Sequence, residues 1–424
     1  MGLTSRERVL MALNHEETDR VPIDLGSSRS TGINAIAYQA LKKYLGVQSE
    51  TVLFDVKQLL AQPDYEVLRR VGSDVVMLPR LVPSIGIPID EYKIGELPRG
   101  GGRCLLAKKF EPVQLEDGSL GVYDSQGHLL AKRPQDGLYF DEMYHPLEDA
   151  GSEEDIDKNL VLPEITDEEM EFQRVKAKDI YENTDFAISG ATSFSLFEKG
   201  TKDWGYENYL IQFYEEPELV EYYLDKMTDA YIVMMERYLD AVGDYVQVVQ
   251  NNDDFGSQTG LLVSPEIYRR FFKPRHARIN EAIRRKKKDM HISLHCCGSI
   301  YPLIGDFIEA GFDILNPIQK ECANMDPVRI KREYGKNMTI WGGALSTQTT
   351  MTHGSVEDIV NEVKEMIKIY APGGGFVFSQ IHNIQADISP EKIMALFDTA
   401  LKYGVPSWYR NQKEWGNTPR DIGI

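Results

Sequence analysis

Cysteine is scarce in this sequence, and long apolar runs are absent from it. Its 424 residues include four cysteines, Cys104, Cys296, Cys297 and Cys322, too few for a fold held together by disulfides. No uncharged apolar segment approaches the roughly 20 residues that a membrane-spanning helix needs. The first residues also lack the basic start and the apolar stretch of a secretory signal. We therefore expect a cytoplasmic protein in a reducing compartment, with no membrane partner.

Basic residues are fewer than acidic ones. The 47 lysines and arginines stand against 66 aspartates and glutamates, which gives a formal net charge of −19 at pH 7. Nucleic acids are bound by basic surfaces, and the local basic run at 284–288 is typical of a solvated helix end. The charge balance therefore excludes nucleic acid as the main partner.

Short apolar runs alternate with helical patterns along the chain. Eight runs are continuously apolar, which predicts parallel strands covered on both faces. The first residues predict a capped amphipathic helix over 4–13. Eight alternating units predict an α/β fold, a single (β/α)8 TIM barrel spanning residues 1–424. The predicted strands are 20–26, 74–79, 186–192, 245–252, 291–298, 313–319, 338–344 and 375–382, and the helices include 217–239, 264–285, 356–370 and 389–403.

Residues 98–148 break this alternation. Asp-Gly pairs at 117–118 and 136–137 separate short apolar stretches, which is the pattern of β-hairpins. We predict a β-ribbon insertion between barrel units two and three. Two roles stay open from the sequence, a lid over the active site or a surface hairpin without a part in function.

A His-x-Cys pair ends the fifth predicted strand. Catalytic groups of a TIM barrel lie at the C-terminal ends of its strands, and His295 and Cys297 share one face because side chains alternate along a strand. Imidazole and thiolate are zinc ligands, and three protein ligands leave one position open for substrate. We therefore predict a zinc site of His295, Cys297 and His382, the last at the end of strand eight, with Cys296 packed behind the barrel. The alternative is that these are structural side chains.

Two acids follow the fourth strand. Asp253 and Asp254 are predicted catalytic residues, because neighbouring carboxylates push one pKa upward and can act as acid and base. Their alternative roles are a helix cap and a solvated loop acid. Polar or aromatic side chains at neighbouring strand ends, and nearby phenylalanines, are predicted to contact substrate, although core packing is the alternative for the aromatic ones. The predicted substrate-binding residues are Asn252, Asn316, Gln319 and Trp341, and Phe194 and Phe255 are further stacking candidates.

A family resemblance extends over nearly the whole chain. Its motifs are TSRER at 4–8 with RVP at 20–22, DDFGSQ at 253–258, LVSPEIY at 262–268, HCCGS at 295–299, DILNPIQ at 313–319, and GGG at 373–375 with PEKI at 390–393. At these residues the sequence resembles the uroporphyrinogen decarboxylase superfamily, which includes cobalamin-dependent methyltransferases. The resemblance implies a TIM barrel, in agreement with the alternation of strands and helices.

One missing motif and one shared motif indicate the branch within this superfamily. Members that decarboxylate porphyrins carry an Arg-Gln-Ala-Gly-Arg stretch near the N-terminus, whereas this chain has LGSSR at 25–29. A porphyrin with many carboxylates needs several cations. The methyltransferase branch shares the His-x-Cys pair, and its third zinc ligand, usually Cys, lies near the end of the last strand, where this chain has His382.

The resemblance therefore implies a corrinoid-dependent methyltransferase of the kind found in anaerobic O-demethylase systems. The expected partners are a small methyl donor, best an aryl methyl ether, and a separate corrinoid protein that accepts the methyl group on cobalt. Three alternatives stay open: a uroporphyrinogen-type decarboxylase, a methyltransferase from a methylcorrinoid to a thiol such as coenzyme M, and a barrel that only docks the corrinoid protein. A homodimer is an open alternative for the assembly.

The missing arginine-rich stretch generates a first prediction. Purified protein incubated with uroporphyrinogen should release no CO2, because one arginine after the first strand is too few cations to pair with the substrate carboxylates. Steady CO2 release from that substrate would show that the assignment to the methyltransferase branch is wrong.

Overall fold

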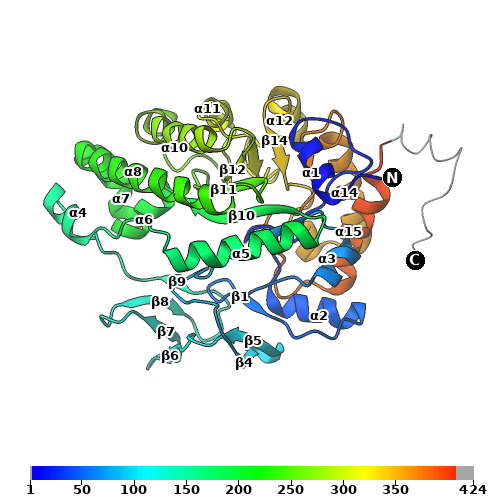
Figure 1. Cartoon of the computed structure of the whole chain (residues 1–424), viewed down its shortest axis with the longest axis horizontal. Helices are drawn as coiled ribbons and strands as arrows, with labels where there is room; N and C mark the ends of the chain where they lie inside the picture. The colour runs from blue at the N-terminus through cyan, green and yellow to red at the C-terminus, as the bar shows by residue number, and fades with distance from the viewer. Residues whose placement is uncertain (1, 407–424) are drawn as a thin grey trace, which may run out of the picture.

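A curved parallel sheet of seven strands forms the centre of the molecule (Figure 1). The computed structural model describes residues 2–406, apart from the side chains of residues 191–193. Neighbouring strands are paired in parallel, and each pair is joined by a connection that contains helices. In spatial order the strands are β15 (Phe376–Val377), β14 (Thr339–Trp341), β13 (Ile314–Asn316), β12 (His291–His295), β11 (Val248–Asn252), β10 (Ala187–Phe194) and β3 (Val75–Leu78).

Residues 20–26, the first predicted strand, fill the eighth position of the barrel but form no regular strand. Ile23 bridges Phe378 in parallel, after the end of β15. On the other side, the amide of Asp74 donates to the carbonyl of Ile23 at 2.7 Å, just before β3 begins. The segment therefore joins the two edges of the sheet. This arrangement confirms the predicted (β/α)8 class.

Helices surround the sheet, and most predicted boundaries hold within a few residues. The predicted helix over 356–370 is α14 (Val356–Tyr370), whereas the one over 264–285 is divided into a short helix, a π-helical turn and α10. The capping box predicted by the first residues is formed, since Thr4 and Glu7 bond each other's backbone amides. The remaining helices are α1 (Ser5–Leu13), α2 (Ala35–Leu45), α3 (Tyr65–Val71), α4 (Glu153–Asn159), α5 (Asp167–Asn183), α6 (Phe197–Trp204), α7 (Tyr206–Glu215), α8 (Pro217–Val242), α9 (Pro265–Ile267), η2 (Tyr268–Phe272), α10 (Lys273–Lys286), α11 (Ile304–Glu309), α12 (Pro327–Tyr334), α13 (Thr350–His353) and α15 (Pro390–Tyr403), with 3-10 turns η1 (Pro98–Gly100) and η3 (Tyr301–Leu303).

Helix α1 closes the end of the barrel at which the strands begin. Val9 and Leu13 are buried there in one apolar cluster with residues from the barrel interior. The interior members come from six strands and are Val75, Ala187, Val248, Ile314, Trp341 and Val377. Apolar side chains therefore fill this end, and polar interior groups lie toward the opposite end, where the strands finish.

Antiparallel strands lie between β3 and β10, at the bottom of the view in Figure 1. They begin at Tyr92, earlier than the expected start at 98, which falls in the turn between the first two strands. Residues 92–96 alternate between exposed and half-buried positions and only Leu97 is buried, so Tyr92–Leu97 lacks the apolar run that would mark a strand. The strands are β4 (Tyr92–Leu97), β5 (Gly102–Ala107), β6 (Val113–Gln114), β7 (Leu120–Tyr123), β8 (Leu129–Arg133) and β9 (Asp141–Glu142), and a separate hairpin pairs β1 (Leu53–Asp55) with β2 (Leu60–Ala61).

The chain returns from these strands across the end of the barrel at which the parallel strands finish. The hydroxyl of Tyr139 donates to Gln385 at 2.8 Å, beyond β15. The amide of Leu147 donates to the carbonyl of Asp203 at 2.8 Å, at the end of α6. The insertion is thereby attached to the mouth of the barrel on two sides. These attachments leave both of its predicted roles open.

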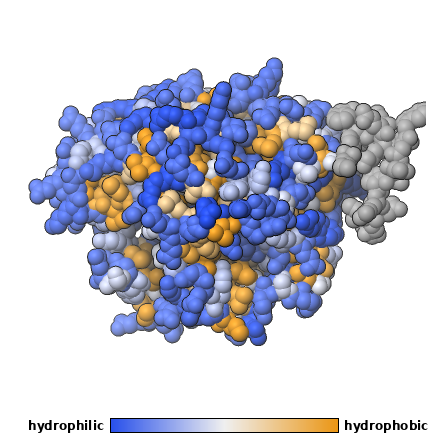
Figure 2. All heavy atoms as spheres, viewed as in Figure 1, coloured by the Kyte–Doolittle hydropathy of each residue, from blue (hydrophilic) through white to orange (hydrophobic). Residues whose placement is uncertain are grey.

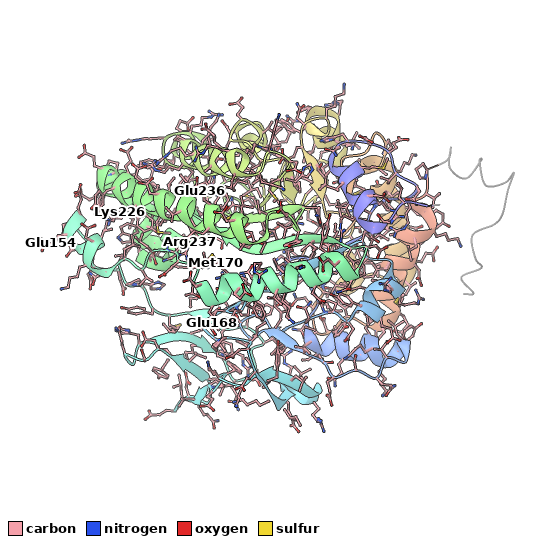
Figure 3. The ribbon with its side chains drawn as sticks, viewed as in Figure 1. Glu154, Glu168, Met170, Lys226, Glu236 and Arg237 are labelled. Carbon is pink, nitrogen blue, oxygen red and sulfur yellow. The ribbon has the colours of Figure 1, made fainter. Side chains whose placement is uncertain are left out.

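The outer face over α4, α5 and α8 is largely hydrophilic (Figure 2). Figure 3 shows two residues of this face, Lys226 and Arg237, on α8. Lys226 pairs with Asp157 at 2.5 Å and Arg237 pairs with Asp167 at 2.6 Å. Charge pairs of this kind are typical of a solvated helix surface. Among residues 2–406 no helix combines the length and the apolar character needed to cross a membrane.

The barrel closure depends on the buried carboxylate of Asp74. Arg8 donates to it at 2.7 Å and Arg20 at 2.6 and 2.9 Å, and the amide of Ile23 donates at 2.9 Å. Replacement by alanine would remove the carboxylate that pairs with Arg20 and one of the two carboxylates that pair with Arg8, which also contacts Asp19. We predict that Asp74→Ala lowers the free energy of unfolding by about 3–5 kcal/mol, measured by denaturant titration.

Asp398→Ala is the matched control. Asp398 pairs with Arg70 at 2.9 Å, but both side chains are more than one-third exposed, so its loss should cost less than about 1 kcal/mol. Equal losses for the two variants would contradict the importance assigned to the buried network.

Candidate functional site

Three side chains with metal-binding atoms converge where β11 and β12 end. His295 is the last residue of β12. Cys297 lies in the loop after β12, and Asp254 lies in the loop after β11. The Cys297 Sγ lies 3.3 Å from the His295 Nε2, and an Asp254 carboxylate oxygen lies 3.9 Å from the same nitrogen. The ligand atoms of the three residues lie within 4.8 Å of one another. The predicted His-x-Cys pair is therefore brought together with one of the two predicted acids.

Close backbone contact between the two loops holds this cluster. Gly298 has φ +92°, and a Cβ there would lie 2.5 Å from the backbone carbon of Gly256. Only glycine fits both constraints. The same approach brings the amide of Cys297 to 2.6 Å from the carboxylate of Asp254, to which it donates. The glycines of the two motifs thus set the position of the acid relative to the thiol.

The ring of His295 is oriented by its other nitrogen. Nδ1 lies 2.6 Å from Asn316 Oδ1 and 3.0 Å from the Ser30 hydroxyl. Because the amide nitrogen of Asn316 donates to the carbonyl of Trp341 at 2.8 Å, its oxygen is the atom that faces the imidazole and accepts from Nδ1–H. Nε2 is then directed at Cys297 and Asp254. Burial opposes the charged ring, but the interactions with Cys297 and Asp254 outweigh it and raise the pKa of His295 to about 10.

Asp253, the other predicted acid, lies away from this cluster and contacts the start of α6. Its fully buried carboxylate accepts bonds from the amides of Leu196, Phe197 and Glu198, at 3.0, 2.7 and 3.1 Å. It also lies 2.8 Å from His276 Nε2. These contacts anchor the first turn of α6 and engage both carboxylate oxygens. These contacts agree with the alternative role of a helix cap, and the catalytic role of Asp253 stays a prediction.

His382, the predicted third zinc ligand, lies beside this cluster and not within it. Its ring centroid is 6.3 Å from that of His295, and the metal-binding group found among the described residues contains Asp254 in its place. Burial, followed by the charge of His295, lowers the pKa of His382 to about 4. His382 is thus a neutral imidazole close to the site at physiological pH.

Three of the predicted substrate-binding residues line a cavity, and the fourth supports a neighbouring loop. Asn252, Asn316 and Trp341 line a cavity in the barrel interior together with His295. Trp341 is nearly buried and its indole nitrogen donates to Asp24 at 2.8 Å. Gln319 accepts from the amide of Gly298 at 3.1 Å, so it supports the loop that carries Cys297. The remaining cavity wall is dominated by neutral polar groups, from Ser27, Ser28, Ser30, Thr31, Ser189, Gln250, Asn251 and Ser293 with Val248.

The aromatic stacking candidates and the second cysteine belong to the core. Phe194 and Phe255 are fully buried, and Phe255 packs against Phe197 and Tyr268 with ring centroids 5.0 Å apart in each pair. Cys296 is buried as well, and its sulfur accepts from the amide of Phe255 at 3.3 Å. Core packing, the alternative stated for the phenylalanines, is the arrangement observed, and Cys296 packs behind the barrel as predicted.

Sequence reasoning missed Glu198 and Ser30. Glu198 lies in the first turn of α6, and burial followed by the carboxylate of Asp254 raises its pKa to about 7. Its charge is balanced in part by Lys202, whose ammonium lies 4.0 Å away. Both residues follow predicted strands, Ser30 the first and Glu198 the third. A search for polar groups beyond every strand end, and not only the later ones, would have found them.

The donor set fits a zinc ion. A thiol, an imidazole nitrogen and a carboxylate are the groups that bind Zn²⁺ in proteins. Asn316 holds the imidazole from behind, as the hydrogen-bond partners of zinc-bound histidines do. The amide of Cys297 fixes Asp254 in the same way. The site therefore presents three ligands and a supporting hydrogen-bond network on rigid strand ends.

The role assigned to Asn316 can be tested by zinc competition titration. We predict that Asn316→Ala weakens zinc binding by about 10–100-fold, because the imidazole loses the acceptor that orients it. Asn316→Asp retains an oxygen that accepts from the imidazole but loses the donor to the Trp341 carbonyl, so it should bind zinc more tightly than Asn316→Ala. Equal affinities for the alanine variant and the unaltered protein would contradict the role.

Comparisons with known proteins agree with the fold. The family described as uroporphyrinogen decarboxylase (URO-D) matches residues 174–403. A uroporphyrinogen decarboxylase of Alkalilimnicola ehrlichii is 24 % identical over 98 % of both chains, and one of Nitrosococcus oceani is 25 % identical over 46 % of this chain and 50 % of its own. A solved methyltransferase from Methanosarcina mazei, 19 % identical, covers 95 % of this chain and 99 % of its own with a TM-score of 0.57. The chain therefore belongs to the uroporphyrinogen decarboxylase family.

Proposed function

We propose that this protein is a methyltransferase that moves a methyl group from a small methylated compound, best an aryl methyl ether, to a corrinoid carried by a separate protein. The observation that carries the proposal is the convergence of Asp254, His295 and Cys297 beside a polar cavity at the barrel mouth. A decarboxylase that uses no metal needs no thiol paired with an imidazole at this position. The His-x-Cys motif and the similar fold of the Methanosarcina mazei methyltransferase support the same branch.

The three converging residues would hold a zinc ion, with one position left for the substrate. Zinc bound there supplies Lewis acidity, which makes the oxygen of an ether a better leaving group. Ser30 and Asn316 keep the imidazole of His295 in the required orientation. Glu198 has a pKa of about 7, which suits a residue that gives a proton to a leaving oxygen and regains it between turnovers. The same three residues would also serve methyl transfer from a corrinoid to a thiol. The assay below distinguishes the two directions of methyl transfer.

Decarboxylation of a porphyrin is the rival, favoured by the names of the curated relatives. Such a substrate carries many carboxylates and needs unpaired cations. The two arginines near the cavity, Arg29 and Arg80, are each paired already, with Asp55 and Glu169. The charges around the mouth therefore favour a substrate with few negative groups.

The test combines metal analysis with a methyl-transfer assay. The protein should contain about one zinc per chain and should methylate a reduced corrinoid protein from an aryl methyl ether. Cys297→Ala and Asp254→Ala should each lose zinc and transfer together, because each removes a ligand. Methylation of a thiol from a methylated corrinoid, with no reaction of the ether, would establish the opposite direction.

Two matched variants make this test specific. Cys296→Ala removes a neighbouring thiol whose only described partner is the amide of Phe255, and it should keep both zinc and activity. His382→Ala decides between the two third ligands: retained zinc identifies Asp254, and lost zinc identifies His382, as the sequence predicted. An unaltered protein that is fully active without metal would overturn the zinc proposal.

A further inference from the structure

The chain returns from the insertion to the barrel through residues 139–147, named here the return segment. This segment contacts two loops or helices that belong to the site. At its start, Tyr139 contacts the loop after β15, in which His382 lies. Further along, it contacts the last turn of α6, the helix that has Glu198 in its first turn. One short segment therefore connects two sides of the barrel mouth, the one after β15 and the one after β10.

The return segment is fixed between these two contacts. Phe140 is 1 % exposed, and its ring packs edge-on against Phe110 with the ring centroids 5.9 Å apart. The amide of Phe140 donates to the carbonyl of Lys57 at 2.9 Å. A closely packed side chain of this kind resists displacement of the backbone on either side of it. Tyr139 and Glu142 are therefore held by the core, and they do not lie at the tip of a free hairpin.

Tyr139 begins a chain of polar contacts that ends at His382. Its hydroxyl donates to the Gln385 Oε1 at 2.8 Å. The amide nitrogen of Gln385 donates in turn to the Asn383 Oδ1 at 2.5 Å. Asn383 is buried, and its side chain interacts with the imidazole of His382. Because this ring lies beside that of His295, with centroids 6.3 Å apart, the insertion reaches the site through two amide side chains.

Glu142 contacts the site through a shared lysine. Its carboxylate pairs with Lys57 and lies 3.7 Å from the ammonium of Lys202. The same ammonium lies 4.0 Å from the carboxylate of Glu198. Lys202 is thus placed between two carboxylates, one from the insertion and one from the site. Without Glu142, the lysine would be able to move toward Glu198 and hold its carboxylate in a closer ion pair.

The backbone at the end of α6 is held by the same segment. The Nδ1 of His145 donates to the carbonyl of Lys202 at 2.7 Å, and the amide of Leu147 donates to the carbonyl of Asp203 at 2.8 Å. Carbonyls in the last turn of a helix have no partner within the helix and need one from elsewhere. Since Asp253 accepts from the amides at the start of α6, the helix is fixed at both ends.

We propose that the return segment is a fixed support of the active site, with Tyr139 and Glu142 as its positioning residues. Tyr139 acts on the imidazole of His382, and Glu142 acts through Lys202 on Glu198. Neither residue touches the reacting atoms. The inference rests on the proposed function, in which Glu198 gives a proton to the leaving oxygen. It gives the insertion a part in function, as a fixed support and not as a movable lid.

Side-chain NMR of protein labelled with ¹⁵N-histidine tests Tyr139 without any methyl transfer. The chain has eight histidines, and the signal of His382 is identified by its loss in His382→Ala. Tyr139→Phe removes one hydroxyl and should shift this signal, because Gln385 and Asn383 lose the donor that orders them. Tyr123→Phe is the matched control, since Tyr123 is 43 % exposed on β7 of the same insertion, and it should leave the signal in place. An unchanged His382 signal in Tyr139→Phe would overturn the inference.

Steady-state kinetics of methyl transfer test both positions. Tyr139→Phe and Glu142→Gln should each lower kcat by about tenfold or more while KM changes less than about twofold, because they displace groups that act in the chemical step. In a Lys202→Met background, Glu142→Gln should change kcat less than about twofold, since the contact that transmits its effect is already lost. Glu111→Gln is the matched control, because it removes a carboxylate of the insertion that is 80 % exposed, and it should leave kcat unaltered. An equal loss of kcat from Glu142→Gln with and without Lys202 would refute the role of Glu142.

The two measurements separate this inference from the proposed function. If the unaltered protein transfers no methyl group in either direction, the proposed function fails, and the His382 signal still decides whether the return segment positions the site. If methyl transfer occurs and neither Tyr139→Phe nor Glu142→Gln lowers kcat, the proposed function stands and the inference fails. The insertion would then be a surface hairpin without a part in function.

Discussion

The closure of the barrel by residues 20–26 is the constraint on which the site depends. This segment is too irregular to form a strand, yet it must lie between β15 and β3 for the sheet to join. The buried Asp74 holds it there by accepting from its arginine and its backbone. Only with this closure can Ser30, which follows the first segment, contact His295 at the end of the fifth strand. Polar residues 265 positions apart in sequence thereby meet.

The two ends of the barrel have opposite chemistry. At the end where the strands begin, α1 and interior apolar residues exclude water, which stabilises the closed sheet through burial. At the other end, serine, asparagine and glutamine side chains fill the interior. This division places hydrogen-bonding groups on rigid strand ends, where small displacements are resisted by the packed layer beneath. A metal cluster and a substrate cavity can then occupy one polar end without loss of the core.

Charges near the mouth are arranged in pairs. Asp253 lies opposite His276, Arg80 opposite Glu169, and Arg29 opposite Asp55. Buried charges require such partners, because a lone ion in the interior is strongly unfavourable. Each pair orients a group as well as neutralising it. Asp253 positions α6 and Glu198, while Glu169 and Asp55 each fix the guanidinium group of one arginine.

The sequence by itself determined the barrel class, the limits of several helices and the His-x-Cys pair. These features are local: continuous apolar runs mark covered strands, capping residues mark helix starts, and alternation along a strand places residues 295 and 297 on one face. The start of the insertion at Tyr92, hidden by a weakly apolar strand, was missed. Which acid joins His295 and Cys297 was decided only by tertiary structure. Asp253 and Asp254 have the same chemistry and adjacent positions, and only the approach of Gly256 to Gly298 brings one to the thiol, while α6 engages the other. The neighbours of Arg80 and Ser30 were undetermined for the same reason, since contacts between distant segments are set by how the strands close into a barrel.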